Sequence, residues 1–191
     1  WGTRALVEHV IHTKLQPHGT LGTCWEPACN RGYMARPLRE YFAAVYASDI
    51  CDYGWDRMNG VDDFLLSGTR PDFGNGQIAD WVITNPPFRL AEQFIEKAMN
   101  CTRIGFAMLV RTSFLESVGR YERMFSKNPP TVVCQFVERL PMVKGRVDRK
   151  ASTATSYAWL VWKHGMSPQP FMWIPPCRAR LERDTDYQVV A

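Results

Sequence analysis

The sequence predicts an α/β fold in which a mostly parallel sheet is covered by helices on both faces. Short apolar runs alternate with amphipathic helical patterns along most of the chain. The run "RIGFAMLV" at residues 103–110 is almost continuously apolar, as strands buried on both faces are. The last two predicted strands follow one another without a helix between them, which indicates an antiparallel pair at one edge of the sheet.

The individual elements follow from the period of the apolar residues. Alternating or continuous apolar runs predict strands at residues 22–26, 43–50, 79–84, 103–110, 131–137 and 157–163. Apolar residues three and four apart predict helices at residues 4–15, 35–42, 89–100 and 114–125. The last of these helices is expected to end before the prolines of "KNPPT", and the tail after Gly165 carries no clear pattern.

Composition predicts one globular domain over residues 1–191. The chain is 46% hydrophobic and 22% charged, which supports a single sizeable core. The net charge of +4 is compatible with a polyanionic partner but is weak support for one. The chain begins with Trp1 and not Met, so we expect residues to be missing before it.

The six cysteines point to a reducing compartment. They are scattered and form no CxxC pair, so neither a metal site nor a disulfide framework is expected. No signal peptide is visible, and the apolar runs are too short to cross a bilayer. We therefore expect a cytoplasmic protein with reduced thiols, no metal and no membrane contact.

Polar features follow several of the predicted strands: "EPACNRG" from Glu26, the acid Asp49, "DDFL" from Asp62, and "NPPF" from Asn85. Open α/β sheets bind ligands at the carboxyl ends of their strands, near the point where strand order reverses. The convergence of these features predicts one ligand site at that edge.

The first loop does not match a phosphate-binding loop. It lacks both G-x-G-x-x-G and the Lys-Ser/Thr of a P-loop. Glu26 would repel a pyrophosphate but suits a ligand with a positive charge, such as an amino group or a sulfonium. Asn30 stands where glycine is common in such loops, and Asn tolerates a positive φ.

The acids after the next strands suit a nucleoside. Asp49 can accept hydrogen bonds from both ribose hydroxyls, although a helix cap or a solvated acid is the alternative. Asp63 can accept from an exocyclic amine and Phe64 can pack on a purine, or they can be a capping acid and a core residue.

The residues Asn85, Pro86, Pro87 and Phe88 carry the most specific signal. Here the chain resembles the class I S-adenosylmethionine-dependent methyltransferases, and specifically the DNA adenine enzymes, which have Asp/Asn/Ser-Pro-Pro-Tyr/Phe/Trp at the end of the fourth strand. The resemblance extends over roughly residues 1–163, with "EPACNRG", Asp49 and "DDFL" similar to the cofactor motifs. The second copy, "KNPPT", lacks the aromatic residue and precedes a strand.

This resemblance implies a Rossmann-like, mostly parallel seven-stranded sheet and S-adenosylmethionine as the cofactor. The residues that it implies for cofactor binding are Glu26, Pro27, Ala28, Cys29, Gly32, Asp49, Ile50, Asp63, Phe64 and Asn85. The residues that it implies for catalysis are Asn85, Pro86, Pro87 and Phe88.

The motif suits methylation of an aromatic amine, whose lone pair is delocalised into the ring. Two fixed acceptors, the Asn85 side chain and the Pro86 carbonyl, would favour the change to tetrahedral geometry at the nitrogen. The two prolines make this corner rigid and remove competing donors. The Phe88 ring offers a stacking face for a base rotated out of the helix.

Basic residues near the same edge predict contacts with phosphates. The linker at residues 139–156 is a possible target-contacting loop, although such a run is often only solvated. The predicted nucleic-acid contacts are Arg111, Arg139, Lys144, Arg146, Arg149 and Lys150. Larger members of the family carry a separate target-recognition domain, for which this chain has no room, so sequence-selective recognition is either in doubt or confined to short loops.

The resulting hypothesis is a DNA adenine-N6 methyltransferase of phage or bacterial type. Four alternatives remain open: methylation of adenine in RNA, of cytosine N4 in DNA or of a protein glutamine, and a non-catalytic subunit of the same fold.

Overall fold

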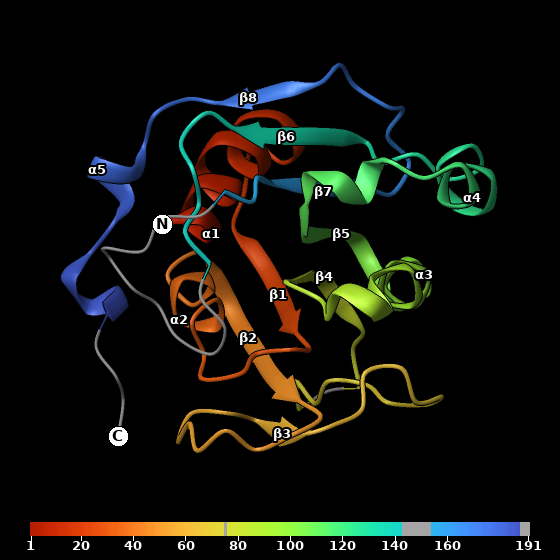
Figure 1. Cartoon of the computed structure of the whole chain (residues 1–191). Helices are drawn as coiled ribbons and strands as arrows, with labels where there is room; N and C mark the ends of the chain where they lie inside the picture. The colour runs from red at the N-terminus through yellow and green to blue at the C-terminus, as the bar shows by residue number, and fades with distance from the viewer. Residues whose placement is uncertain (75, 143–153, 188–191) are drawn as a thin grey trace.

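The computed structural model describes residues 1–74, 76–142 and 154–187 and contains one mixed sheet (Figure 1). The sheet has eight strands in the order β3-β2-β1-β4-β5-β7-β6-β8. Their bounds are β1 Leu21–Glu26, β2 Phe42–Asp49, β3 Gly60–Val61, β4 Ala79–Thr84, β5 Thr102–Arg111, β6 Val132–Phe136, β7 Tyr157–Lys163 and β8 Met172–Ile174. The predicted fold class is therefore confirmed, with eight strands instead of seven.

The strand pairing defines where the sheet reverses direction. Strands β3, β2, β1, β4 and β5 are parallel, whereas β7 runs antiparallel to both β5 and β6. The predicted antiparallel pair exists, but it does not form the edge, because β8 lies outside β6 and parallel to it. The two strands that the sequence pattern did not predict, β3 and β8, have only two and three residues, so they carry almost no periodic pattern.

The helices agree with prediction in position more than in extent. The first runs from α1 (Gly2–Leu6) into the π-helical segment η1 (Val7–Leu15), and α3 (Ala91–Cys101) follows the short 3₁₀ turn η2 (Phe88–Leu90). The helix predicted over 35–42 is only α2 (Ala35–Leu38), because Phe42 already belongs to β2.

The helix predicted over 114–125 is broken. The structure has a 3₁₀ turn, η3 (Thr112–Leu115), and then α4 (Val118–Arg120) and η4 (Tyr121–Phe125). Ser117 is extended and its hydroxyl accepts a hydrogen bond from the Arg120 N–H at 3.3 Å, so a new helix begins there. The "NPP" at residues 128–130 lies between η4 and β6, as predicted.

Helices cover both faces of the sheet (Figure 1). In that view α1 and α2 lie on one side, and α3 and α4 lie on the other. Each face has its own apolar core: Leu6 and Ile11 pack with Trp81 and Trp159 on the first side, and Phe94 belongs to the core on the second. Among the described residues, no helix is both long and apolar enough to cross a membrane.

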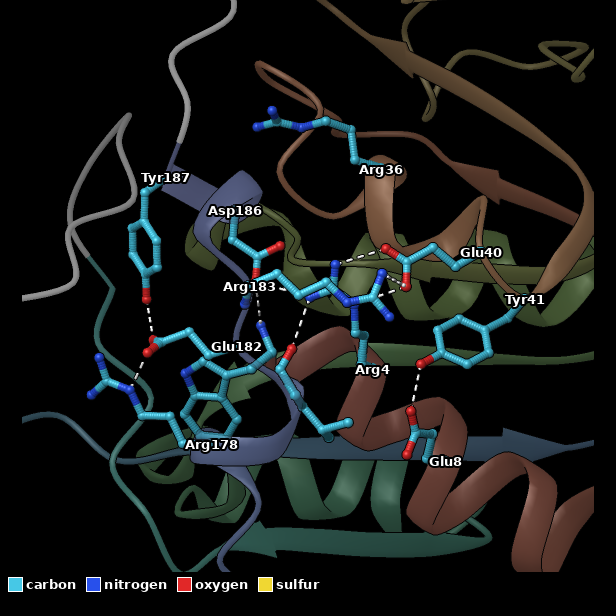
Figure 2. A network of polar contacts seen from close by, with 12 residues as sticks. Arg4, Glu8, Arg36, Glu40, Tyr41, Arg178, Glu182, Arg183, Asp186 and Tyr187 are labelled. Atoms are coloured by element: carbon cyan, nitrogen blue, oxygen red, sulfur yellow. Dashed lines mark hydrogen bonds and ion pairs between the residues drawn. The ribbon is translucent and has the colours of Figure 1, made fainter.

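The C-terminal segments α5 (Arg178–Leu181) and η5 (Asp184–Tyr187) are held against the first helix by Arg4 (Figure 2). The guanidinium of Arg4 is buried and makes two bonds to Glu40, at 2.7 and 2.9 Å. It also donates to Asp186 at 2.9 Å and to the Leu181 carbonyl at 3.0 Å. One side chain thus connects the start of the chain, the α2–β2 junction and the C-terminal turns.

Replacing Arg4 with Ala should destabilise the fold by about 2–4 kcal/mol, because two carboxylates lose their buried partner. Urea unfolding measures this difference. The matched control is Arg70→Ala, since Arg70 is exposed and makes no ion pair within the described part of the chain. Equal unfolding midpoints for the two variants would contradict the role given to Arg4.

Candidate functional site

The parallel strands bring the predicted motifs to one edge of the sheet. Strand β1 pairs with β2 on one side and with β4 on the other, so the order of the sheet reverses between β1 and β4. Glu26, Asp49 and Thr84 end these three neighbouring strands. In Figure 1, the arrowheads of β1 and β2 point the same way, and β3 pairs with the last two residues of β2, Ser48 and Asp49. This is the edge at which α/β sheets bind ligands.

Glu26 is the most unusual ionisable group at this edge. Its side chain is 1% exposed, and one carboxyl oxygen accepts a hydrogen bond from the Thr84 hydroxyl at 2.9 Å. The other oxygen, Oε2, is buried without a hydrogen-bond partner. Burial raises the pKa of Glu26 to about 8; the Thr84 hydroxyl opposes this rise, the charge of Asp49 adds to it, and the Ala28 backbone N–H opposes it. A buried acceptor without a donor suggests a missing partner.

The loop after Glu26 is held in one shape by its neighbours. Asn30 has a φ of +49°, as its position predicts, and its backbone N–H donates to Asp49 Oδ2 at 2.9 Å. Gly32 has a φ of +75°, and a Cβ there would lie 2.4 Å from the ring of Trp55. Only glycine combines this backbone conformation with such a close contact.

Asp49 accepts hydrogen bonds from the protein's own backbone, and its predicted role in binding ribose stays a prediction. Besides the Asn30 bond, its Oδ1 accepts from the Cys51 N–H at 3.3 Å. Each oxygen of an ionised carboxylate can accept more than one hydrogen bond, so capacity for ribose hydroxyls remains. Ile50, the next residue, is 62% exposed, which leaves its apolar side chain available to a ligand.

Phe64 and Cys29, two of the predicted cofactor contacts, are packed inside the protein. Phe64 is 2% exposed and packs against Trp25 and Phe94, with ring centroids 4.9 and 4.7 Å apart. Its role is the core role that the sequence left as the alternative. Cys29 is buried, its thiol packs with Ala35, Ala47 and Trp55, and burial raises its pKa.

The remaining predicted cofactor residues differ in exposure. Asp63 is exposed and its Oδ1 accepts from the Leu65 N–H at 2.9 Å, which makes the capping turn that was the alternative for it. The other carboxylate oxygen of Asp63 has no partner within the described ranges. Pro27 is buried beside Glu26, and Ala28 is partly buried.

The "NPPF" corner presents a buried acceptor without a partner and a half-exposed ring. Oδ1 of Asn85 is buried and has no hydrogen-bond partner, like Oε2 of Glu26. Pro86 is buried, whereas Pro87 is exposed and Phe88 is 47% exposed. The Leu90 N–H donates to the Pro87 carbonyl at 2.8 Å, so the chain turns directly into η2 and α3. The corner is thus fixed on both sides by regular structure.

Of the predicted nucleic-acid contacts, only Arg111 and Arg139 lie among the described residues, and their contact with nucleic acid stays a prediction. The guanidinium of Arg111 lies over the Phe88 ring, with its carbon 4.1 Å from the ring centroid. Arg139 is exposed and donates to the Ala154 carbonyl at 2.8 Å, across the linker. Lys144, Arg146, Arg149 and Lys150 lie outside the described residues, so their role stays a prediction.

A surface hollow elsewhere contains none of the predicted residues. It has a volume of about 590 Å³ and lies between α3 and η4, where Glu92, Arg123 and Asn128 contribute to its lining. Glu92 and Arg123 form an ion pair there at 3.0 Å. The hollow therefore adds nothing to the site at the strand ends.

Sequence reasoning missed two residues of the site. Thr84 holds Glu26, and the only signal for it was a polar residue closing the apolar run "ADWVIT". Trp55 covers Gly32, and its indole N–H is buried without a partner. Nothing in the local pattern around Trp55 indicated a position beside the first loop.

The sequence matches no protein-family model and no curated protein. Similarity to solved structures is clear, however. A methyltransferase subunit of a type I restriction-modification system from Streptococcus thermophilus is 9% identical, with a TM-score of 0.57 over 99% of this chain. A Listeria monocytogenes protein assigned to the class I S-adenosylmethionine-dependent methyltransferases is 14% identical, with a TM-score of 0.53 over 92% of this chain.

A dimethyladenosine transferase from Plasmodium falciparum is 12% identical, with a TM-score of 0.50 over 84% of this chain. At these identities the similarity establishes the fold. The chain has the Rossmann-like fold of the class I S-adenosylmethionine-dependent methyltransferases, as the resemblance implied. It spans 49% of the Streptococcus chain, 64% of the Listeria chain and 60% of the Plasmodium chain.

The Glu26 carboxyl should make stability fall as pH rises. Its pKa is about 8 in the folded protein against an ordinary 4.5, so between these values only the folded state holds the proton. The free energy of unfolding should therefore decrease over this interval by on the order of 4 kcal/mol. Glu26→Gln, which cannot ionise, should lose this decrease and be more stable than the wild type at the upper end.

Urea unfolding between about pH 5 and pH 8 tests this prediction. Glu116→Gln is the matched control, because Glu116 is exposed. It should keep the pH dependence of the wild type. If Glu26→Gln also keeps it, Glu26 ionises normally in the folded protein.

Proposed function

We propose that this protein transfers a methyl group from S-adenosylmethionine to the exocyclic N6 amine of adenine in DNA. The observation that carries the proposal is the pair of buried acceptors without donors, Glu26 Oε2 and Asn85 Oδ1, at the ends of adjacent strands. A ligand that brings a cation to one and an amine to the other would satisfy both.

The cofactor half of the site fits the β1 and β2 ends. Glu26 would face the positively charged end of the cofactor, and Asp49 would accept from its ribose hydroxyls. Ile50 offers an exposed apolar side chain beside the adenine ring. When bound, S-adenosylmethionine supplies an electrophilic methyl group, so this chemistry needs no metal and no covalent intermediate.

The base half of the site fits the β4 end. Oδ1 of Asn85 and the carbonyl of Pro86 would accept the two hydrogens of the target amine and favour its change to tetrahedral geometry. The prolines keep these acceptors in place during reaction, so no energy is lost in reorienting them. The amine nitrogen would take the methyl group as the bond from that group to the sulfonium sulfur breaks, which leaves a neutral thioether, and the nitrogen would then release one proton to water. Phe88, which is half exposed, offers a stacking face to the base.

Two observations support a nucleic-acid substrate: the first, the charge, supports any polyanion and only weakly, and the second is the reason for placing DNA before RNA. The net charge is +4, and the predicted phosphate contacts begin at Arg111, next to Phe88. Among the similar structures, one is a subunit of a restriction-modification system and another is a dimethyladenosine transferase. Adenine in RNA is the second candidate, favoured by the same acceptors.

The direct test is transfer of a labelled methyl group from S-adenosylmethionine, offered separately to duplex DNA, structured RNA and protein. We expect label in DNA, and digestion to nucleosides should place it in N6-methyladenine. Label in RNA alone would favour the second candidate. Label in protein alone, or in none of the three, would overturn the proposal.

Asn85→Ala should reduce turnover about 100-fold or more while leaving cofactor affinity nearly unchanged, because it removes a fixed acceptor from the transition state. Turnover and cofactor binding by calorimetry are the measurements. Asn128→Ala is a matched control from the second Asn-Pro-Pro sequence. A collapse of cofactor affinity in Asn85→Ala with normal turnover per bound cofactor would refute the role given to Asn85.

Glu26→Gln should lower cofactor affinity more than turnover, which is the reverse of the effect of Asn85→Ala. It removes the carboxyl that would lose its proton and become negatively charged when the cationic end of the cofactor binds beside it, so cofactor affinity should fall by about 10-fold or more. Turnover at saturating cofactor should change much less, since Glu26 does not face the amine. If Glu26→Gln left cofactor affinity unchanged, Glu26 would not belong to the cofactor site.

A further inference from the structure

The ring of Phe88 and the guanidinium of Arg111 form a stacked pair at the edge of the candidate site. The guanidinium carbon lies 4.1 Å from the ring centroid. Phe88 is 47% exposed and Arg111 is also exposed. Within the described ranges, no carboxylate forms an ion pair with Arg111. The ring is therefore the main partner of this cation in the described structure.

The backbones of both residues are fixed, so only the side chains can move. Arg111 is the last residue of β5 and pairs with Tyr157 of β7. The next N–H, that of Thr112, donates to the Ser156 carbonyl at 3.0 Å. Phe88 opens η2 directly after Pro87. Any change in the stacked pair thus comes from rotation of the Arg111 or the Phe88 side chain.

A guanidinium and a nucleobase are both planar, and both stack on an aromatic face. At an exposed site the contact between a cation and a ring is weaker than base stacking. A guanidinium also binds phosphate oxygens through two parallel hydrogen bonds. When a nucleotide enters this edge, its base can therefore compete with the guanidinium for the Phe88 ring, and its phosphate can bind the guanidinium.

We propose that Arg111 is a positioning residue for the target base. In the empty protein its guanidinium occupies the face of Phe88 on which the base stacks, and the entering nucleotide moves it to a neighbouring phosphate. This inference rests on the proposed function, since it requires the base to stack on Phe88. Arg111 would thus cover the Phe88 ring in the empty protein and contact the nucleic-acid strand in the complex.

Nuclear magnetic resonance of the Arg111 Nε–H group tests the exchange. The ring current of Phe88 should shift this proton upfield in the empty protein, and Phe88→Leu should abolish the shift. Arg111→Lys assigns the signal, because it removes it. The probe is single-stranded oligodeoxyadenylate added with S-adenosylhomocysteine, which fills the cofactor site. Loss of the upfield shift on binding supports the exchange, and a shift that persists in the complex overturns it.

Salt dependence tests the phosphate contact. For wild type, Arg111→Lys and Arg111→Ala, oligodeoxyadenylate affinity is measured by anisotropy between about 50 and 200 mM salt. Arg111→Ala should reduce the slope of log affinity against log salt by about 0.7, the value for one phosphate on a single strand. Arg111→Lys should keep most of it. Arg180→Ala, a change on α5, is the control and should match wild type; an unchanged slope in Arg111→Ala contradicts the contact.

The two proposals fail in distinguishable ways. If the wild-type protein binds and methylates adenine but the Arg111 signal stays upfield, only the exchange is wrong. If it neither binds oligodeoxyadenylate nor methylates DNA, the proposed function falls and this inference falls with it.

Discussion

The buried hydrogen bond between Thr84 and Glu26 joins the two strands on which the candidate site is built. It connects the ends of β1 and β4, the point at which the sheet reverses its order. Only one oxygen of Glu26 is satisfied, and burial holds its pKa near 8. A buried acid that lowers the stability of the protein as pH rises toward neutrality is typical of functional sites, where such conflicts are retained.

The chemistry of the edge follows from which groups remain unpaired. Glu26 and Asn85 each present a buried acceptor, whereas Asp49 already accepts backbone N–H groups and still has free lone pairs. A site of acceptors selects ligands rich in donors or positive charge. In the proposed function, the double proline would keep the amine side of the site rigid, and the pair of Phe88 and Arg111 would face the nucleic acid.

The accuracy of the sequence predictions follows the strength of the local signal. Strands β4 and β7 match their predicted bounds because both are mostly apolar and are buried along all or nearly all of their length. Strands β3 and β8 were missed because two or three residues show no period. The helix predicted over 114–125 has a continuous apolar pattern, but Ser117 begins a new helix within it. A capping side chain competes with helical propensity, and the pattern does not show which prevails.

The sequence alone determined the alternation of elements, the parallel character of the sheet and the motif at the end of β4, because periodicity and turn chemistry act between near neighbours. Only the tertiary structure decided which groups meet. Thr84 reaches Glu26 across 58 residues, Trp55 covers Gly32, and Phe64 turns into the core instead of toward a ligand. The contact of Arg111 with Phe88 depends likewise on β4 and β5 being neighbours. Such contacts depend on strand order and side-chain rotamers, which are set by packing of the whole molecule and not by adjacent residues.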